Sequence, residues 1–535
     1  MMNRWLMSTL GALCAVGLAM AQPRIVINEF AYDDTGSDNL EFIELYNADD
    51  VPVDITGWVV DCGDQLSGDN NRDFVIGDLD EDNVVDTTVI LNPGQFYVIG
   101  TPDLNTRCGG CVNQIFTPGT AGAIENDNEW IALIIPGEPR VVVDAVVYEA
   151  NKSALSSWVP ADIIPQLGGG LWGNYQSLEA GTTTDDAFMT IGRWRDGLDT
   201  NVNGRDFGHM RPSPGASNNL PALQGRLCLD FDNYSVGDRP SEFTGSYREP
   251  RVIDPTQADN TAATAFNPNA LPASPQGGNA MMVRDWEGGG NVAVSNFVYE
   301  GNAGYDLYVY INPDTSAFSA GQVETWMIGI GGADSVHNHP LFLETATAGS
   351  ANGMTGVGWV FRRSRAAATN PTQPTEVKLR LVDAGKGGDS RLSGPNNTWN
   401  IFGEIDLTGL SAGWYRLRLE VVNGAVKGYF YGDPNNPTVI CGTTATGWVG
   451  GFYIGYRETL SNNAARINPV RIDGACFYVP VEGDVDGNGC VDDADLLQVL
   501  FAFGASECSP ADVNGDGIVD DADLLTVLFN FGNGC

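Results

Sequence analysis

Two nearly identical acidic segments close this sequence, and they constrain the fold of its C-terminal end more tightly than any other feature. The first copy runs from Asp484 to Asp495, and the second begins 28 residues later and runs from Asp512 to Asp523. Both copies carry oxygen-bearing side chains at loop positions 1, 3, 5, 9 and 12, with glycine at position 6. Side chains at alternating positions of a tight loop point inward, so their oxygens converge. This spacing predicts two loops that each bind a hard divalent cation.

Calcium fits such loops, because it takes about 6–8 oxygen ligands. The expected ligands of the first loop are five side chains and one backbone carbonyl: Asp484, Asp486, Asn488, Asp492 and Asp495, with the carbonyl of Cys490. Those of the second loop follow the same order: Asp512, Asn514, Asp516, Asp520 and Asp523, with the carbonyl of Ile518. Val491 and Val519, at position 8, are placed to pair the two loops through a short β-bridge. We therefore expect two bound calcium ions in one paired module.

An apolar helical pattern follows each loop, over Leu496–Gly504 and Leu524–Gly532. Leu496, Leu500 and Phe503 share one face of the first helix, and the glycine at the end of each segment is a natural C-terminal stop. A segment this short buries little core by itself. Metal binding is therefore expected to contribute to its folding.

Duplicated loops with aspartate at position 12, each followed by a single helix, resemble the type I dockerin family. The resemblance covers residues 483–535, after a linker at Val479–Gly483. It implies two calcium ions and docking onto a cohesin-type receptor. In that family the pair at loop positions 10 and 11 helps to select the receptor. Both copies here have an Asp-Ala pair instead of the hydroxyl pair of well-known cellulosomal examples: Asp493, Ala494, Asp521 and Ala522.

The first 21 residues are interpreted as a secretory signal. A basic start is followed by an apolar stretch that ends in Ala19-Met20-Ala21, which predicts cleavage after Ala21. No later run approaches the ~20 apolar residues of a membrane span. We expect a secreted or cell-surface protein without a membrane span.

The composition is strongly acidic, with 68 Asp and Glu residues against 28 Lys and Arg residues and a formal net charge of −40. Such a surface repels nucleic acid and anionic membranes and attracts divalent cations. Nucleic acid is therefore excluded as a partner. The length of 535 residues suggests three or four domains. Strand-like alternation between Gly, Asn and Pro turns makes the chain mainly β, built from sandwiches.

Nine cysteines remain after removal of the signal, and an exported protein should oxidise most of them. Cys228 and Cys476 bracket the middle domain and are expected to tie its first and last strands together. Two groups of three each allow three pairings and leave one cysteine over: Cys62, Cys108 and Cys111, and Cys490, Cys508 and Cys535. We interpret Cys108-Gly-Gly-Cys111 as disulfide partners in a loop, because no second pair of metal ligands lies nearby.

Strand-like segments begin directly after the signal and define a first domain at residues 22–220. The most distinctive segments are Asn28-Glu29, Glu41–Asn47, Gly57-Trp58 and Pro214-Gly215. Over residues 23–218 this succession resembles the lamin-tail domain family in its bacterial exported form. The resemblance implies an immunoglobulin-like sandwich that serves in interaction or surface attachment and has no catalytic residues. Glu41 and Glu44 belong to this strand motif and are not interpreted as an acid/base pair.

A second β domain is expected at residues 225–478. Leu417, Leu419 and Val421 alternate with charged residues, which predicts a sheet with one solvated face, and Asn423-Gly424 predicts a hairpin turn. The size and density of strands suggest a jelly roll. The pattern resembles the concanavalin A-like lectin/glucanase and laminin-G superfamily, in which polysaccharide recognition and hydrolysis both occur.

A glucanase would need two carboxylates on one strand. Glu404-Ile405-Asp406 begins like the laminarinase-type motif, but Thr408 and Gly409 stand where the second glutamate belongs. The segment is therefore interpreted as an ordinary strand, and no catalytic residue is assigned.

Three other features have residue types that occur in binding sites. Asp199–Met210 copies the first half of a calcium loop without its closing carboxylate, and His337-Asn338-His339 is the one close histidine pair. Both are interpreted as ordinary loops. Exposed tryptophans could stack on sugars, although most tryptophans of a sandwich are core residues. The candidates, as a class, are Trp286, Trp326, Trp359, Trp399, Trp414 and Trp448.

Together these patterns predict a secreted, non-catalytic modular binding protein. A calcium-dependent dockerin would anchor it to a scaffold or surface, and its sandwiches would take part in polysaccharide recognition. The alternative is an extracellular glycoside hydrolase with its active site in the middle sandwich.

Overall fold

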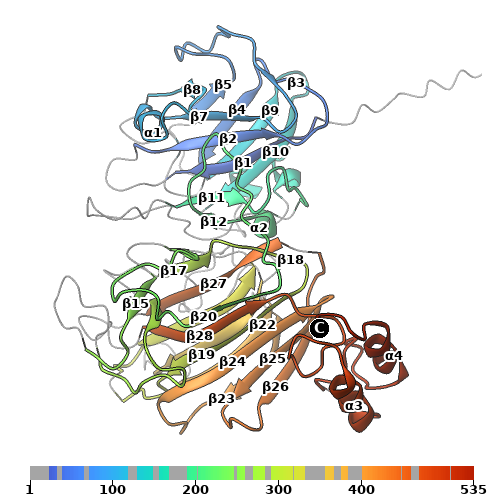
Figure 1. Ribbon diagram of the computed structural model, residues 1–535. Helices are drawn as coiled ribbons and strands as arrows, with labels where there is room; N and C mark the ends of the chain where they lie inside the picture. Colours follow the sequence, from blue (N-terminus) through green and yellow to red (C-terminus); the bar gives the residue numbers. More distant parts are fainter. Residues whose placement is uncertain are drawn as a thin grey trace, which may run out of the picture.

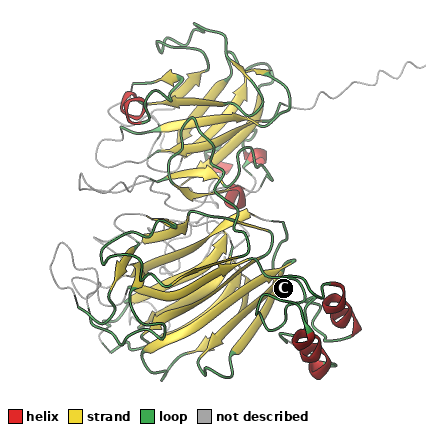
Figure 2. Cartoon of the chain, viewed as in Figure 1, coloured by secondary structure: helices red, strands yellow, loops and turns green. Residues whose placement is uncertain are grey.

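The computed structural model describes most of the chain after the expected signal. The described residues are 23–32, 39–64, 72–117, 124, 129–148, 156–167, 189–201, 203–245, 250–258, 269–283, 291–316, 318–331, 356–366, 375–383, 400–447, 449–458, 469–506 and 508–535. Two β-sandwiches follow each other along the chain, and a small helical module lies beside the second one (Figures 1 and 2). The expected mainly β fold is confirmed. No helix in these ranges is both long enough and apolar enough to cross a membrane.

The N-terminal sandwich has two main sheets, in the orders β12-β11-β1-β2-β7-β8 and β10-β9-β4-β5, and a short pair, β3-β6. Its strands are Ile25–Ala31 (β1), Phe42–Asn47 (β2), Val53–Asp54 (β3), Val59–Asp64 (β4), Arg72–Val75 (β5), Ile90–Leu91 (β6), Phe96–Gly100 (β7), Gln114–Ile115 (β8), Glu129–Ile135 (β9), Val141–Tyr148 (β10), Thr190–Arg193 (β11) and Phe207–Met210 (β12). Its helical turns are Pro102–Arg107 (α1), Ile164–Gln166 (η2) and Asn203–Asp206 (α2).

Three of the four distinctive segments of the first domain, Asn28-Glu29, Glu41–Asn47 and Pro214-Gly215, meet through hydrogen bonds. The pairing of β1 with β2 shifts register between Ile27 and Glu29. Glu29 accepts hydrogen bonds from the backbone N–H and hydroxyl of Ser213, and Glu44 accepts one from the backbone N–H of Gly215 at 2.7 Å. Burial raises the pKa of Glu29 to about 7. These carboxyl groups therefore fasten the Ser213–Gly215 turn to the sheet, in agreement with the structural role expected for this motif.

The middle sandwich is formed by two larger sheets, ordered β15-β16-β28-β19-β24-β25-β26, with β13 paired to β28, and β14-β17-β27-β20-β21-β22-β23, with β18 paired to β27. Its strands are Arg226–Leu229 (β13), Phe243–Gly245 (β14), Arg251–Ile253 (β15), Ala280–Val283 (β16), Asn291–Ser295 (β17), Tyr299–Glu300 (β18), Ala303–Ile311 (β19), Val323–Gly331 (β20), Val357–Ser364 (β21), Glu376–Asp383 (β22), Asn400–Asp406 (β23), Gly413–Val422 (β24), Ala425–Tyr431 (β25), Thr438–Thr443 (β26), Val449–Glu458 (β27) and Val470–Tyr478 (β28).

One core fills the space between the two large sheets, and the predicted alternation of β24 supplies part of it. Leu417 and Leu419 belong to this core. Asn423 and Gly424, both at positive φ, form the predicted turn between β24 and β25. The prediction that the other face of β24 is solvated is wrong for its second half. Arg418 and Glu420 are buried there, because the C-terminal module contacts this end of the sheet.

The two sandwiches also share an apolar cluster. Trp194, directly after β11, packs with Val294 and Met327 of the second large sheet. Its ring lies against Gly451, where an added methyl group would be 3.4 Å from it. Arg195 forms an ion pair with Glu300 across the same junction. The face of β17 and β20 that points away from the middle core is therefore partly covered by the first domain.

Four disulfides are present in the described chain, and they resolve the pairings that the sequence left open. Cys228–Cys476 joins β13 to β28 as predicted, and Cys108–Cys111 closes its loop. Cys62 is the unpaired, buried member of the first group. In the second group Cys490 pairs with Cys535, and Cys508 pairs with Cys441 of β26. The last bond links the C-terminal module covalently to the middle sandwich, a link that the sequence reading did not foresee.

Candidate metal centre and docking face

The first acidic loop folds around the carboxylate of Asp484. This group accepts hydrogen bonds from the backbone N–H groups of Gly487 at 2.7 Å and Gly489 at 2.8 Å. Both glycines adopt positive φ, of 72° and 93°, a conformation that glycine enters without steric cost. Carboxylate oxygens of Asp484, Asp486 and Asp495 all lie within 4.8 Å of one another. The loop thus gathers three of its predicted ligands at one point.

Position 12 is built into the start of the following helix, Asp493–Ala502 (α3). The buried Asp495 carboxylate accepts backbone N–H groups from Asp486 at 3.1 Å and Asp492 at 2.8 Å. Asp492 caps the helix by accepting the N–H of Ala494 at 2.7 Å. This reciprocal arrangement is a capping box. The helix start therefore holds the last carboxylate over the loop.

The second loop repeats this geometry, with Asp521–Phe529 (α4) as its helix. Asp512 accepts the N–H groups of Gly515 at 2.8 Å and Gly517 at 2.9 Å. Asp523 accepts the N–H of Asn514 at 3.1 Å and that of Asp520 at 2.9 Å. The side-chain amide of Asn514 donates a hydrogen bond to Asp516 at 3.0 Å, and that of Asn488 donates one to Asp486 at 3.2 Å. The two loops therefore have equivalent donor sets.

The residues present fit a calcium ion. Every predicted ligand atom is an oxygen, and oxygen is the donor that calcium prefers. Burial raises the pKa of Asp484 to about 6, and the nearby Asp495 carboxylate adds to the shift. Carboxylates this close repel one another unless a cation lies between them. The position 7 carbonyls of Cys490 and Ile518 would complete each ligand set.

The predicted β-bridge between Val491 and Val519 is wrong. Val491 instead exchanges backbone hydrogen bonds with Gly532 and Asn533, at 2.8 and 3.0 Å. Val519 does so with Gly504 and Ala505, at 2.8 and 2.9 Å. Each loop is thus paired with the segment that follows the other loop's helix. The crossed pairing still joins the two halves into one unit.

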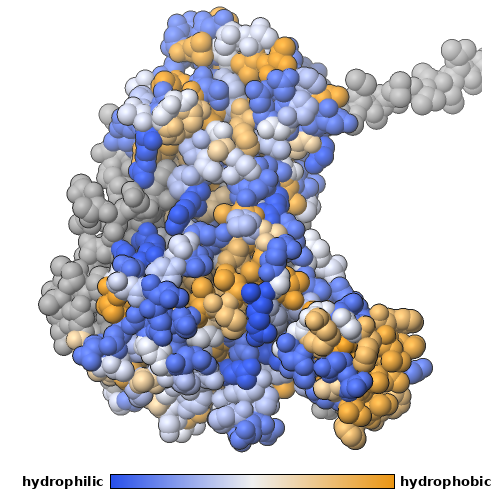
Figure 3. Space-filling model, in the orientation of Figure 1, coloured by the Kyte–Doolittle hydropathy of each residue, from blue (hydrophilic) through white to orange (hydrophobic). Residues whose placement is uncertain are grey.

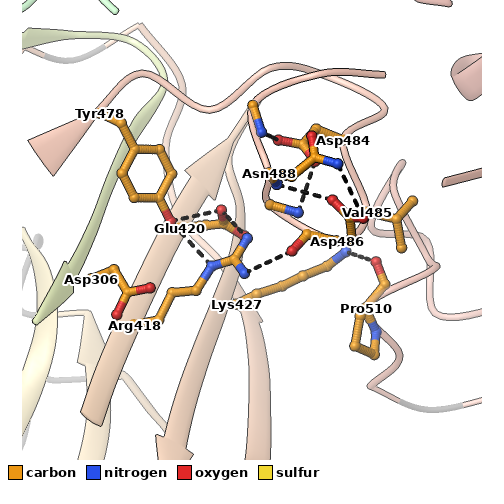
Figure 4. Close-up of polar contacts among 12 residues, drawn as sticks. Asp306, Arg418, Glu420, Lys427, Tyr478, Asp484, Val485, Asp486, Asn488 and Pro510 are labelled. Carbon is orange, nitrogen blue, oxygen red and sulfur yellow. Dashed lines mark hydrogen bonds and ion pairs between the residues drawn. The ribbon is translucent and has the colours of Figure 1, made fainter. Parts of the chain in front are cut away.

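Two cations of the middle sandwich contact the backbone of these loops (Figure 4). Lys427 donates from Nζ to the carbonyls of Asp512 at 2.6 Å and Pro510 at 2.9 Å. Arg418 lies 3.4 Å from the carbonyl of Asp486. Burial lowers the pKa of Lys427, and the carboxylates around it oppose that change. One cation therefore reaches each loop, through main-chain oxygens and not through the predicted side-chain ligands.

Arg418 is itself held by a buried polar network. It forms an ion pair with Glu420 at 2.6 Å and donates from Nε to the hydroxyl of Tyr478 at 3.1 Å. Tyr478 donates to the same Glu420 carboxylate at 2.9 Å. The guanidinium also lies over the ring of Tyr429, 5.0 Å from its centroid. The side chains beneath the first loop are therefore held in place by contacts within the middle sandwich.

The opposite side of the module presents an apolar surface, called the helix face here. It consists of exposed side chains on and after the two helices: Leu497, Leu500, Phe501, Phe503, Leu525, Leu528, Phe529 and Phe531. Phe501 is 86% exposed and Phe529 83%. The buried apolar side chains are the smaller Val499 and Val527. Figure 3 shows this surface as the broad hydrophobic patch at the lower right.

The predicted receptor-selecting pairs lie at the start of the helix face. Asp493, Ala494, Asp521 and Ala522 are all exposed in the first turns of α3 and α4. Leu497 comes three residues after Ala494, and Phe501 comes four residues after Leu497. These helical spacings place all three residues on the same side of α3. The structure thus joins the selecting positions and the apolar side chains into one surface.

Glu404 and Asp406, the carboxylates of the laminarinase-like segment, do not form a catalytic site. Glu404 is bound by Lys378 and Arg380, and the hydrogen bond from Lys378 lowers the pKa of Glu404. Asp406 accepts the N–H of Thr408 in a turn. Trp326 and Trp359 are core residues and Trp414 is half-buried. The histidine pair, Trp286, Trp399 and Trp448 lie outside the described residues.

The half-loop at Asp199 is filled by an arginine. Arg193 lies 2.8 Å from Asp144, 3.5 Å from Asp206 and 3.8 Å from Asp199. All of these groups except Asp199 are fully or almost fully buried. The Arg193 guanidinium therefore balances Asp199, the first residue of the half-loop, together with Asp144 and Asp206.

A further acidic loop was missed by the sequence reading. Asp78, Asp80, Asp82 and Asp86 have the spacing of positions 1, 3, 5 and 9, and oxygens of Asp78, Asp80 and Asp86 lie within 4.8 Å of one another. The spacing itself could have revealed it. Position 12 is Val89, so the closing carboxylate is lacking.

Comparison with known proteins identifies part of the first domain. Residues 19–150 match the Lamin Tail Domain family. No curated protein sequence matches the chain. Similar solved structures include lectin II from Ulex europaeus, with 9% identity, 48% of this chain and 99% of that chain covered, and a TM-score of 0.28. The CBM2 module of the Lactobacillus casei BL23 phage J-1 evolved Dit has 9% identity, coverages of 48% and 95%, and a TM-score of 0.27. A native glycosidic hydrolase has 10% identity, coverages of 48% and 96%, and a TM-score of 0.24. The family match is therefore confined to residues 19–150, within the first domain.

Proposed function

We propose that this chain is a secreted, non-catalytic modular binding protein whose C-terminal module binds two calcium ions and docks onto a cohesin-type receptor. The observation that carries the proposal is the pairing of two features in one small unit. Three carboxylates converge within 4.8 Å at the first loop, and the helices behind the loops expose two phenylalanines almost completely. The first feature suits a cation and the second suits a protein partner.

Calcium would be held in each loop by the side chains of positions 1, 3, 5, 9 and 12 and by the carbonyl of position 7. When bound, it would supply the positive charge that the converging carboxylates lack. The module's own core supports this dependence, because its fully described buried apolar residues are only valines and one alanine: Val485, Val491, Val499, Ala511, Val519 and Val527. So small a core gives little stability without further links.

The helix face is the proposed receptor contact. Large apolar side chains on a monomer are normally buried, and a contiguous exposed group of them marks an interaction surface. Aromatic anchors such as Phe501 and Phe529 are typical of the residues that dominate binding energy. The Asp-Ala pairs at positions 10 and 11 would then set receptor choice, as the dockerin resemblance implies. The four disulfides are consistent with an exported protein.

The two sandwiches are proposed to be the recognition part of the protein, directed at polysaccharide. The alternative, a glycoside hydrolase, needs an accessible carboxyl group with a raised pKa. Glu404 has a lowered pKa. Burial raises the pKa of Asp473 to about 6, but this side chain has no exposed surface and is hydrogen-bonded to Ser274. These described carboxylates favour binding over hydrolysis.

The test uses the full chain stripped of metal with a chelator. Calorimetric titration with calcium chloride is expected to give two equivalents, and a recombinant type I cohesin domain is expected to bind only in calcium. A chain that takes up no calcium would contradict the metal assignment. Calcium uptake without binding to any of a panel of type I cohesins would leave the metal sites in place and remove the cohesin-type partner from the proposal.

A further inference from the structure

The large sheet that carries the C-terminal module also carries a row of aromatic side chains on the same outer face. We call this group the aromatic strip. It consists of Tyr308 and Tyr310 of β19, Trp414 of β24 and Tyr431 of β25, all half-buried. The residues between them on these strands, including Val309 and Leu417, point into the core. Trp414 also packs against the small buried cluster of Ile253, Ala280 and Met282. The three tyrosines therefore form the part of the strip that lies outside the buried clusters of the sandwich.

Strand register places these rings side by side. Tyr310 is paired with Trp414, and Tyr308 is paired with Arg416, which is in turn paired with Tyr431. The rings of Tyr310 and Trp414 meet edge to face, with centroids 5.7 Å apart. Tyr308 and Tyr431 are separated by two strand spacings, roughly 9.5 Å. The strip is thus long enough to lie under about two linked sugar rings.

The charges inside the strip are already satisfied. Arg416 donates from Nε to Asp306 at 2.7 Å, and its guanidinium lies over the ring of Tyr431, 4.6 Å from the centroid. Trp414 donates its indole N–H to the carbonyl of Pro272 at 2.9 Å. The arginine and Asp306 form one neutral pair, and Asp473, which is paired with Tyr308 in the next strand, is buried and hydrogen-bonded to Ser274. The exposed part of the strip therefore offers no net charge to an ionic ligand.

The polar groups that remain are phenol hydroxyls. Within the described chain, those of Tyr308, Tyr310 and Tyr431 have no protein hydrogen-bond partner. A phenol can donate and accept one hydrogen bond, and its ring offers an apolar face. A sugar ring has the matching features, namely an apolar face of C–H groups and a rim of hydroxyls.

The strip is bounded on two sides. Pro272 and Ser274 contact Trp414 and Asp473 along one edge. At the other end the next row of the sheet, with Arg418, is covered by the C-terminal module. A ligand on the strip would therefore lie beside the module while the helix face stays free, since the helix face is on the module's opposite side (Figures 1 and 3).

We propose that the aromatic strip binds an uncharged polysaccharide chain, which stacks on Tyr308 and Tyr431 across the sheet and against Trp414 at its edge. This inference rests on the proposed role of the sandwiches in polysaccharide recognition and gives that role a site. It separates glycan binding and receptor docking onto different surfaces of the same chain.

The experiment measures binding of the full chain to neutral polymers: insoluble cellulose and chitin, and soluble xyloglucan and barley β-glucan. Polygalacturonate serves as the anionic comparison. The double substitution Tyr308→Ala/Tyr431→Ala is expected to weaken binding to the polymer that the wild type prefers by about tenfold or more. The conservative pair Tyr308→Phe/Tyr431→Phe keeps the rings and should retain most of the affinity. The melting temperature of the alanine pair, compared with that of the wild type, separates loss of the rings from a folding defect. Phe501→Ser, on the helix face, should leave glycan binding unchanged.

Two results overturn the inference in distinguishable ways. If the wild type binds neutral polysaccharide and the alanine pair binds equally well, the aromatic strip is not the binding site. The polysaccharide would then bind elsewhere on the sandwiches. If the wild type binds none of the neutral polymers, or only polygalacturonate, both the strip and the polysaccharide part of the proposed function are wrong. The calcium and receptor assignments are unaffected by either result.

Discussion

The C-terminal module has two faces of opposite chemistry. The inner face meets the middle sandwich through directional polar contacts, with Lys427 on the carbonyls of Pro510 and Asp512 and Arg418 near that of Asp486. A disulfide from Cys508 adds a covalent link. The outer face has large apolar side chains and is exposed. A contact that is permanent within the chain is thus made of hydrogen bonds and a covalent bond, while the apolar surface is left uncovered.

The inner face fixes the orientation of the module, and the outer face is available to a partner. Hydrogen bonds from buried cations define one orientation, because a misplaced carbonyl would leave the cation unsatisfied. Apolar contact is less directional and suits a partner that binds from solution. In the proposed function, receptor docking should therefore depend on the outer face, and the geometry of docking should depend on the inner face.

The largest effect is expected from removal of the closing carboxylates. Asp495→Ala with Asp523→Ala should abolish calcium binding at both loops, because each aspartate is a predicted ligand and also completes a capping box. Loss of the N3 half of each capping box should also weaken the first turn of each helix. Calorimetry with calcium chloride and far-ultraviolet circular dichroism measure the two losses. Asp493→Ala with Asp521→Ala is the matched control, since these exposed neighbours are not ligands. Unchanged calcium uptake in the first variant would show that the loops are not the metal sites.

The next effect concerns the covalent part of the inner face. Cys441→Ser with Cys508→Ser should free the module from β26 and lower its stability against unfolding by about 2–4 kcal/mol, the usual range for a native disulfide. Limited proteolysis between residues 479 and 512 should become faster. Receptor binding should persist, because the outer face is unchanged. If the double serine variant is as resistant as the wild type, the polar contacts alone fix the module.

The outer face is tested by polarity reversal. Phe501→Asp with Phe529→Asp should weaken cohesin binding by about thirtyfold or more, since central aromatic anchors typically contribute about 2 kcal/mol or more. Calcium stoichiometry and the melting temperature should stay close to those of the wild type, because both side chains are more than four-fifths exposed. Surface plasmon resonance with the domain used in the calorimetric test gives the comparison. Equal affinity would place receptor contact away from the helix face.

Local features of the module could be predicted from the sequence, whereas contacts between distant segments could not. The loops were predictable residue by residue, because ligand spacing, glycine positions and helix caps are local properties. The crossed pairing of Val491 and Val519 was not, since it depends on how the two halves fold onto each other. Cys441 stands alone in its strand, so nothing near it in sequence indicates Cys508 as its partner.

The middle sandwich gives the same lesson. The alternation of β24 correctly predicted that Leu417 and Leu419 face the core. It also suggested that Arg418 and Glu420 meet solvent, and the module covers them instead. Periodicity reveals which side of a strand a residue is on, but not whether another domain lies against that side. The sequence named Trp414 of the aromatic strip as a candidate for sugar stacking but not its three tyrosines, because the members come from three strands and meet only through register.

The smallest expected effect isolates the polar part of the inner face. Lys427→Met keeps the length and apolar stem of the side chain but removes the donor to the carbonyls of Pro510 and Asp512. The loss of hydrogen bonds from a half-buried ammonium group should destabilise the docked module by about 1–3 kcal/mol. Thermal unfolding and hydrogen exchange of the residues near 510–517 measure it. Lys378→Met, which breaks an ion pair on the other sheet, is the matched control and should leave that exchange unchanged. If Lys427→Met exchanges no faster than the control, the disulfide and the small valine core hold the second loop in place, and the lysine only fills space beneath it.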